Sequence, residues 1–145
     1  MSSVQAIAPP SSSLSAGQIP PLVEEACAGY DWDGKRVLVI VPDATRTAPV
    51  GPVFRALHSA VAGPCRAFDV MVALGTHPPM SGVAICERLE ITVAEKASTF
   101  SGVNLFNHEW DNPEALACLG SIPAKEIEDL LYTHAQVAEV EVVGL

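Results

Sequence analysis

The hydrophobic positions of this chain alternate between continuous runs and a four-residue spacing. Val37–Val41 is an uninterrupted apolar run, which is typical of a strand buried on both faces. Apolar residues then recur at every fourth position, as in an amphipathic helix: Val53, Leu57 and Val61. Phe68–Leu74 is a second apolar run and predicts a second buried strand. This pattern predicts a βαβ unit whose two strands are parallel and adjacent.

Further elements are predicted on either side of this unit. We expect helices from Pro20 to about Gly29, over 81–89 and over 123–131, a third strand over 103–110, and a closing strand over 138–145. The order predicts an α/β fold: an open, mostly parallel sheet with helices on both faces, Rossmann-like in outline.

The composition agrees with one folded domain behind a leader. Residues 1–19 are rich in Ser, Ala and Pro and predict a flexible leader or a loosely packed arm, whereas residues 20–145 are expected to form one α/β domain. The longest apolar run has six residues, and the first nineteen residues carry no charge. A membrane span and a secretory signal are therefore not expected, and we expect a soluble, cytoplasmic protein.

Charge and cysteine spacing narrow the function classes. Acidic residues outnumber basic ones by 17 to 8, and the net charge is −9. Such a charge repels phosphate backbones, so nucleic-acid binding is not expected. The four cysteines lack the spacing of a metal knuckle, so we expect reduced thiols and no cysteine metal site.

Polar residues follow each of the three central strands. In open α/β sheets, ligands bind beyond the carboxyl ends of the strands, so these residues are expected to share one edge. They are Asp43, Thr45 and Arg46 after the first strand, Gly75, Thr76 and His77 after the second, and Asn107, His108 and Glu109 after the third.

Several of these side chains suit a binding or catalytic site, but structural roles stay open. Arg46 offers a planar fork for a carboxylate or phosphate, and His77 can exchange a proton near neutral pH. Gly75 lets backbone approach a ligand. Asp43 could orient Arg46 or His77, hold a turn or cap the next helix, and His77 could be a loop residue with a structural hydrogen bond. Their convergence favours function for Arg46 and His77.

The other histidines and the common motifs add less. His58 is expected on a helix, exposed or partly buried, and His134 has no obvious partner. His108 could lie behind the site or be structural. No glycine-rich phosphate fingerprint follows Val41, and neither GxSxG nor HExxH occurs, which argues against the corresponding enzyme classes.

Two motifs together resemble a known family. The stretch VPDATRTAP at 41–49, followed by ALGTHPPM at 73–80, is similar to the N-terminal domain of the lactate racemase family, the nickel-pincer-dependent 2-hydroxyacid racemases and epimerases. The segment LGSIPAKEIEDL at 119–130 is also similar. Thr47 stands where the family commonly has a proline.

The resemblance implies a mechanism for this family. The enzymes invert a hydroxyl-bearing carbon of a small 2-hydroxy acid by moving a hydride to the nickel pincer nucleotide and back. By the resemblance, His77 is an acid/base residue and Arg46 binds and polarises the substrate. Asp43 and Thr45 lie beside substrate or cofactor, and so by position do Gly75 and Thr76.

The resemblance also implies that part of the site lies elsewhere. The family's second catalytic histidine, cofactor-bearing lysine and nickel-ligating histidine lie beyond the point that Leu145 matches. We therefore expect half of an active site, inactive without a C-terminal catalytic domain in cis or in trans. A gene fragment, a separate subunit and a degenerate domain stay open. The alternative function is a stand-alone module that binds small carboxylates, or a non-catalytic subunit.

Overall fold

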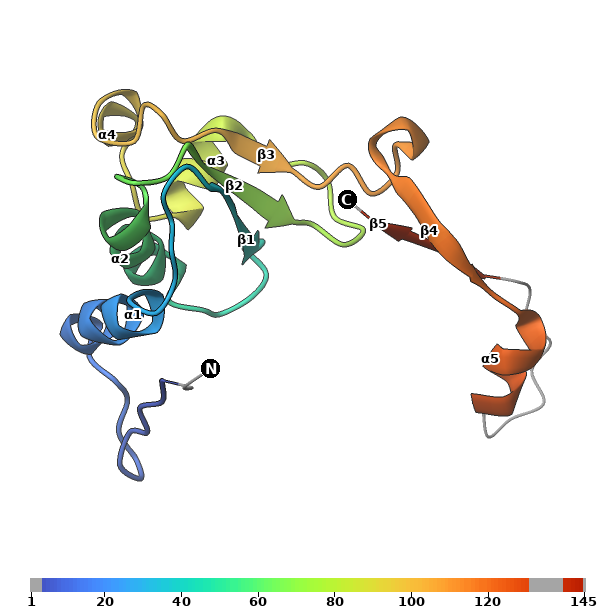
Figure 1. Cartoon of the computed structure of the whole chain (residues 1–145), viewed down its shortest axis with the longest axis horizontal. Helices are drawn as coiled ribbons and strands as arrows, with labels where there is room; N and C mark the ends of the chain where they lie inside the picture. Colours follow the sequence, from blue (N-terminus) through green and yellow to red (C-terminus); the bar gives the residue numbers. More distant parts are fainter. Residues whose placement is uncertain (1–3, 131–139, 145) are drawn as a thin grey trace. The chain divides into compact units, whose positions relative to one another are not determined.

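The structure, a computed structural model, describes residues 4–130 and 140–144, with side chains described as far as Ile127. The chain forms two compact units, one ending at His108 and the other beginning at Glu109 (Figure 1). No change in the sequence pattern marks this boundary. The expected extent of the domain, residues 20–145, stays a prediction, as does the flexibility of the leader, in which residues 4–15 contain no helix or strand.

The first unit contains every element predicted for its part of the chain. In chain order its elements are η1 (Ala16–Gln18), α1 (Ile19–Cys27), β1 (Arg36–Pro42), α2 (Val50–Val61), β2 (Ala67–Ala73), α3 (Gly82–Arg88), α4 (Val93–Ala97) and β3 (Leu105–Asn107). Strand β3 is shorter than the predicted 103–110. Helix α4 was not predicted, although Thr92 and Glu95 form a capping box at its start.

The three strands form a parallel sheet in the order β1-β2-β3. Strands β1 and β2 pair along their whole length, from Arg36 opposite Ala67 to Pro42 opposite Ala73. Strand β3 pairs with β2 over a shorter stretch, which ends with Asn107 opposite Val72. The prediction of an α/β fold with an open parallel sheet flanked by helices is therefore confirmed.

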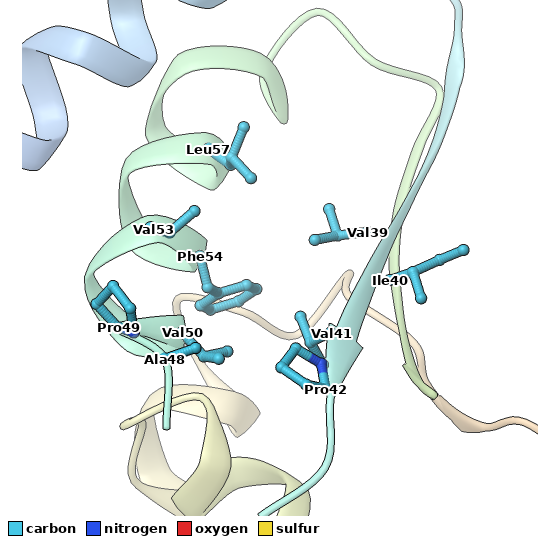
Figure 2. Close-up of a pocket in the computed structure, with 10 residues that line it drawn as sticks. All are labelled: Val39, Ile40, Val41, Pro42, Ala48, Pro49, Val50, Val53, Phe54 and Leu57. Atoms are coloured by element: carbon cyan, nitrogen blue, oxygen red, sulfur yellow. The ribbon is translucent and has the colours of Figure 1, made fainter. Parts of the chain in front are cut away.

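Helices α2 and α3 supply much of the core that covers one face of the sheet. Alternate residues of β2, such as Val70 and Val72, are fully buried, together with Phe54 of α2 and with Leu89, which directly follows α3. Between α2 and β1 lies an apolar cavity of about 250 Å³, into which helix and strand side chains point (Figure 2). Its apolar lining fits packing between the two elements and offers no polar group for binding a charged ligand.

The opposite face of the sheet is exposed in the described part of the chain. Leu38 is 45% exposed, Ile40 56% and Phe106 44%. Figure 2 shows Ile40 pointing away from α2. The expectation that Val37–Val41 is buried on both faces is therefore wrong, and helices cover the described sheet on one face only. A run of branched apolar residues occurs both in strands that are covered on two faces and in strands whose second apolar face is exposed, so the sequence does not distinguish them.

The second unit has a small sheet of its own. Strand β4 (Ala117–Ile122) pairs antiparallel with β5 (Val140–Gly144), with a register shift between Cys118 and Gly120. The 3-10 helix η2 (Pro113–Ala115) precedes β4, and helix α5 (Ala124–Leu130) follows it.

The predictions for this second unit are met in part. The helix predicted over 123–131 and the closing strand are confirmed where they are described. Strand β4 was not predicted, and its antiparallel pairing limits the parallel arrangement to the first unit. His134 lies outside the described residues. In the described part of the chain, no helix combines the length and the apolar character that a membrane crossing requires.

Candidate functional site

The carboxyl ends of the three parallel strands bring the predicted polar residues of the first unit to one edge of the sheet. Pro42 lies opposite Ala73 at the ends of β1 and β2, and Asn107 lies opposite Val72 at the end of β3. The loops that follow β1 and β2 therefore start side by side. The expected convergence of the strand ends is confirmed.

Asp43 holds the first loop in a turn. Its side chain is only 8% exposed. Its Oδ1 atom accepts hydrogen bonds from the backbone N–H of Thr45 at 3.0 Å and from the Thr45 hydroxyl at 2.5 Å. The structural alternative of a turn is thus confirmed for Asp43. Helix capping is not its role, because Pro49 occupies the N-cap of α2.

The second carboxylate oxygen of Asp43 joins the two motif loops. Oδ2 contacts Nδ1 of His77, a residue 34 positions further along the chain. The His77 side chain is 53% exposed, so its ring is anchored at one nitrogen while much of it stays open to solvent. Of the two partners expected for Asp43, the structure shows His77 and not Arg46.

The hydrogen bonds at Asp43 define its charge and the tautomer of His77. The bond from the Thr45 hydroxyl, followed by the bond with His77, lowers the pKa of Asp43 to about 2. The carboxylate is therefore ionised at neutral pH and can only accept hydrogen bonds. Nδ1 of His77 must carry the proton in this contact, which leaves Nε2 of the neutral ring as an acceptor.

Arg46 presents its guanidinium without a protein partner. Its backbone N–H donates to the carbonyl oxygen of Asp43 at 3.3 Å, and the residue is exposed. Within the described chain the guanidinium forms no hydrogen bond and no ion pair, so Asp43 does not orient Arg46 through a side-chain bond. An exposed guanidinium of this kind can bind a carboxylate through two parallel hydrogen bonds.

Gly75 and Thr76 form the turn that leads to His77. The backbone N–H of His77 donates to the carbonyl oxygen of Leu74 at 3.0 Å. Gly75 has a φ of 58°, a left-handed conformation that glycine adopts without the strain of a Cβ. Thr76 is exposed, and its hydroxyl forms no hydrogen bond with any described residue. The glycine therefore shapes the turn that presents His77.

Two further residues anchor the loops, and their roles were not predicted. Asn107 accepts a hydrogen bond from the N–H of Met80 and donates one to its carbonyl oxygen, both at 2.9 Å. Arg88 donates to the carbonyl oxygens of Pro42 and Arg46, again at 2.9 Å in each case. Asn107 could be suspected from its place at a strand end. Arg88 ends a helix, where basic residues are common, so its sequence context carries no signal.

His108 is not seen to contact the Asp43–His77 pair. It is half-buried, and its backbone N–H donates to the carbonyl oxygen of Val72 at 3.0 Å, which extends the pairing of β3. Its ring forms no hydrogen bond among the described residues. A role behind the site stays a prediction. Glu109 begins the second unit, where its carboxylate accepts a hydrogen bond from Asn112.

The described residues do not form a metal centre. Among them, no three His, Cys, Asp or Glu side chains lie together in a way that could hold a metal ion. At this edge of the sheet, Arg46 offers a cation for binding and His77 offers an imidazole for proton transfer.

Comparison with known proteins gives a likeness in fold. No family model matches the chain, and no curated protein matches it. A crystal structure of a protein from Thermotoga maritima, from a structural genomics consortium, matches with a TM-score of 0.75 and 26% sequence identity. The match covers 90% of this chain and 30% of that chain. The present chain thus shares its α/β fold with one segment of that longer Thermotoga maritima protein.

Proposed function

We propose that this chain is the substrate-binding and proton-transferring half of a 2-hydroxyacid racemase or epimerase, similar to lactate racemase. The observation that carries the proposal is the contact between Asp43 and His77, which joins the two loops of the family-like motifs. The unpartnered guanidinium of Arg46 in the first loop adds a binding group for the acid.

Each of the three residues has a defined task in this proposal. Arg46 binds the carboxylate of the 2-hydroxy acid. Nε2 of His77 accepts the proton of the substrate hydroxyl and later returns it, and general base catalysis of this kind contributes roughly 10²–10⁴-fold to a rate. Asp43 keeps the proton on Nδ1 and stabilises the imidazolium that forms.

The remaining chemistry is proposed to lie outside this chain. A nickel pincer nucleotide supplies redox chemistry at the substrate carbon when it is bound, and no residue described here is assigned to hold it. A C-terminal catalytic domain, in cis or in trans, would hold the cofactor. The span of 30% of the matched structure supports such a longer context. The cytoplasm is the proposed setting, and four unpaired cysteines fit a reducing compartment.

Calorimetry with lactate and the full chain tests the proposal. We expect Arg46→Ala to weaken binding about 10- to 100-fold, because a charge-assisted hydrogen bond is lost. His77→Ala should also weaken it. Arg66→Ala is the matched control, since Arg66 is an exposed arginine that precedes β2 at the opposite edge of the sheet. Unchanged affinity in Arg46→Ala, or an equal loss in Arg66→Ala, would reject the proposal.

A stand-alone module for small carboxylates is the second candidate. It is supported by the exposed Arg46, whose guanidinium can bind a carboxylate without any further chemistry. Propionate, which lacks the hydroxyl of lactate, separates the two functions. A racemase half whose His77 bonds the hydroxyl should bind lactate roughly 2- to 10-fold more tightly, because propionate cannot form that hydrogen bond, which contributes about 0.5–1.5 kcal/mol. A carboxylate module should bind both acids equally.

A further inference from the structure

We propose that Arg88 is a positioning residue, which fixes the loop between β1 and α2 so that Asp43 meets His77. Its Nε atom donates to the carbonyl oxygen of Pro42, and its Nη2 atom donates to that of Arg46, both at 2.9 Å. These two carbonyls lie immediately before Asp43 and at Arg46, so one guanidinium spans the segment that contains Asp43 and Thr45.

The segment held by Arg88 has little regular structure of its own. Residues 43–49 belong to no helix or strand. Within them, the backbone N–H of Arg46 donates to the carbonyl oxygen of Asp43 at a long 3.3 Å. The side-chain bonds of Asp43 reach only to Thr45 and His77. A second attachment point is needed to define where the turn sits relative to the sheet, and Arg88 supplies it.

The backbone of Arg88 is held in place by the packing of α3. It is the last residue of α3, whose inward side buries Ile85 and Cys86, and Leu89 directly after it is fully buried. A guanidinium has donors in a rigid planar fork, so two carbonyl oxygens bound by one arginine are held at a fixed separation. The packed position of α3 thereby fixes the position of the loop that carries Asp43 and Arg46.

The predicted consequence is a change at His77, which Arg88 does not contact through any hydrogen bond in the structure. If the loop shifts, the Asp43 carboxylate no longer meets Nδ1, and the neutral ring loses the partner that holds the proton there. Nitrogen NMR of the histidine ring distinguishes the two neutral tautomers. This readout needs no ligand, so it remains informative even where the proposed function fails.

The test compares Arg88→Gln, Arg88→Lys and Arg55→Gln in the full chain. Lysine keeps the charge but lacks the fork. Arg55 is the matched control, because it also donates to a backbone carbonyl, that of Glu90 at 2.7 Å, and pairs with Glu95 at 2.9 Å, without touching either motif loop. Urea unfolding and amide spectra identify folded variants.

We expect both Arg88 variants to lose the Nδ1–H tautomer of His77 and to bind lactate on the order of tenfold more weakly. Arg55→Gln should lower stability and leave the His77 tautomer unchanged. An unaltered tautomer in folded Arg88→Lys or Arg88→Gln would overturn the proposal, as would an equal change in Arg55→Gln. A further outcome separates the two proposals. If the Arg88 variants lose the Nδ1–H tautomer but the unsubstituted protein does not bind lactate, the positioning role is supported and the proposed function is rejected.

Discussion

At the scale of single residues, the ionised carboxylate of Asp43 is the centre of the candidate site. It pairs with Thr45 in its own loop and with His77 in the next one, and these bonds lower its pKa from 3.8 to about 2. A carboxyl whose pKa is depressed in the folded state stabilises that state above the unfolded pKa. Its contribution is lost as the pH falls from about 4 through about 2.

This linkage predicts a pH-dependent effect of Asp43→Asn. The variant should be less stable than the unsubstituted protein at neutral pH, and the difference in free energy of unfolding should shrink as the pH falls from about 4 toward about 2. Urea unfolding at a series of pH values measures it. Glu95→Gln is a comparison outside the site, because the bond with Arg55 lowers the pKa of Glu95 to about 2 as well. A pH-independent difference would contradict the assigned cause.

His58 predicts a second loss of stability at falling pH, in this case in the neutral range. Its ring packs against Phe68 and Phe100, with ring centroids 5.4 and 4.8 Å away, and burial lowers its pKa from 6.5. The unfolded chain therefore binds the proton more readily, so stability should fall as the pH drops below about 6.5. His58→Phe should abolish this part of the pH dependence. An equal slope between about pH 7.5 and about pH 5.5 in both proteins would refute it.

The sequence placed the chemical groups of the site but not the contacts that organise them. Asp43, Arg46 and His77 could be found because they follow strands that end at a common edge. The bonds of Arg88 to the first loop and of Asn107 to Met80 could not, since they join residues as much as 46 and 27 positions apart through backbone groups. Every residue has a backbone carbonyl, so the sequence does not indicate which carbonyl a side chain will bind.

At the scale of elements, the parallel sheet has two unlike faces. The face against α2 and α3 carries the buried core, and the face with Leu38 and Ile40 is exposed. Hydrophobic spacing predicted the strands and helices of the first unit well because each element buries a regular set of positions. It did not predict the exposed face or the antiparallel pairing of β4, since pairing partners and missing layers depend on residues far away in the chain.

Two apolar substitutions should report this difference between the faces. Leu89→Ala removes a fully buried side chain and is expected to lower the free energy of unfolding by about 2–5 kcal/mol. Ile40→Ala, at a side chain that is 56% exposed, should cost less than about 1 kcal/mol. Urea unfolding of both variants checks the order. A larger loss in Ile40→Ala would mean that its face is covered in solution.

The two hydrogen bonds between Asn107 and Met80, here called the clamp, lead to another prediction. Asn107 forms two hydrogen bonds with the backbone of Met80, three residues after His77. Asn107→Ala leaves both backbone groups without this partner and should destabilise the fold by about 1–3 kcal/mol. Hydrogen exchange of the Met80 amide should become faster, while amides in α1 keep their rates. Unchanged exchange at Met80 would show that the loop does not depend on the clamp.

At the scale of the whole molecule, the first unit presents one edge with binding and proton-transfer groups and no metal centre among the described residues. The chain spans 30% of the longer structure that it resembles. The completion of this site by a further part of the protein is a proposal. The central claim is narrower: the loops after β1 and β2 together bind a 2-hydroxy acid.

The most direct test is an NMR titration of the full chain with lactate. We predict saturable shifts at the ring nitrogens of His77 and at the backbone amides of residues 43–46 and 75–77, and much smaller shifts at the His77 ring with propionate, which lacks the hydroxyl. The absence of saturable shifts in both loops, or shifts confined to other parts of the chain, would contradict the claim.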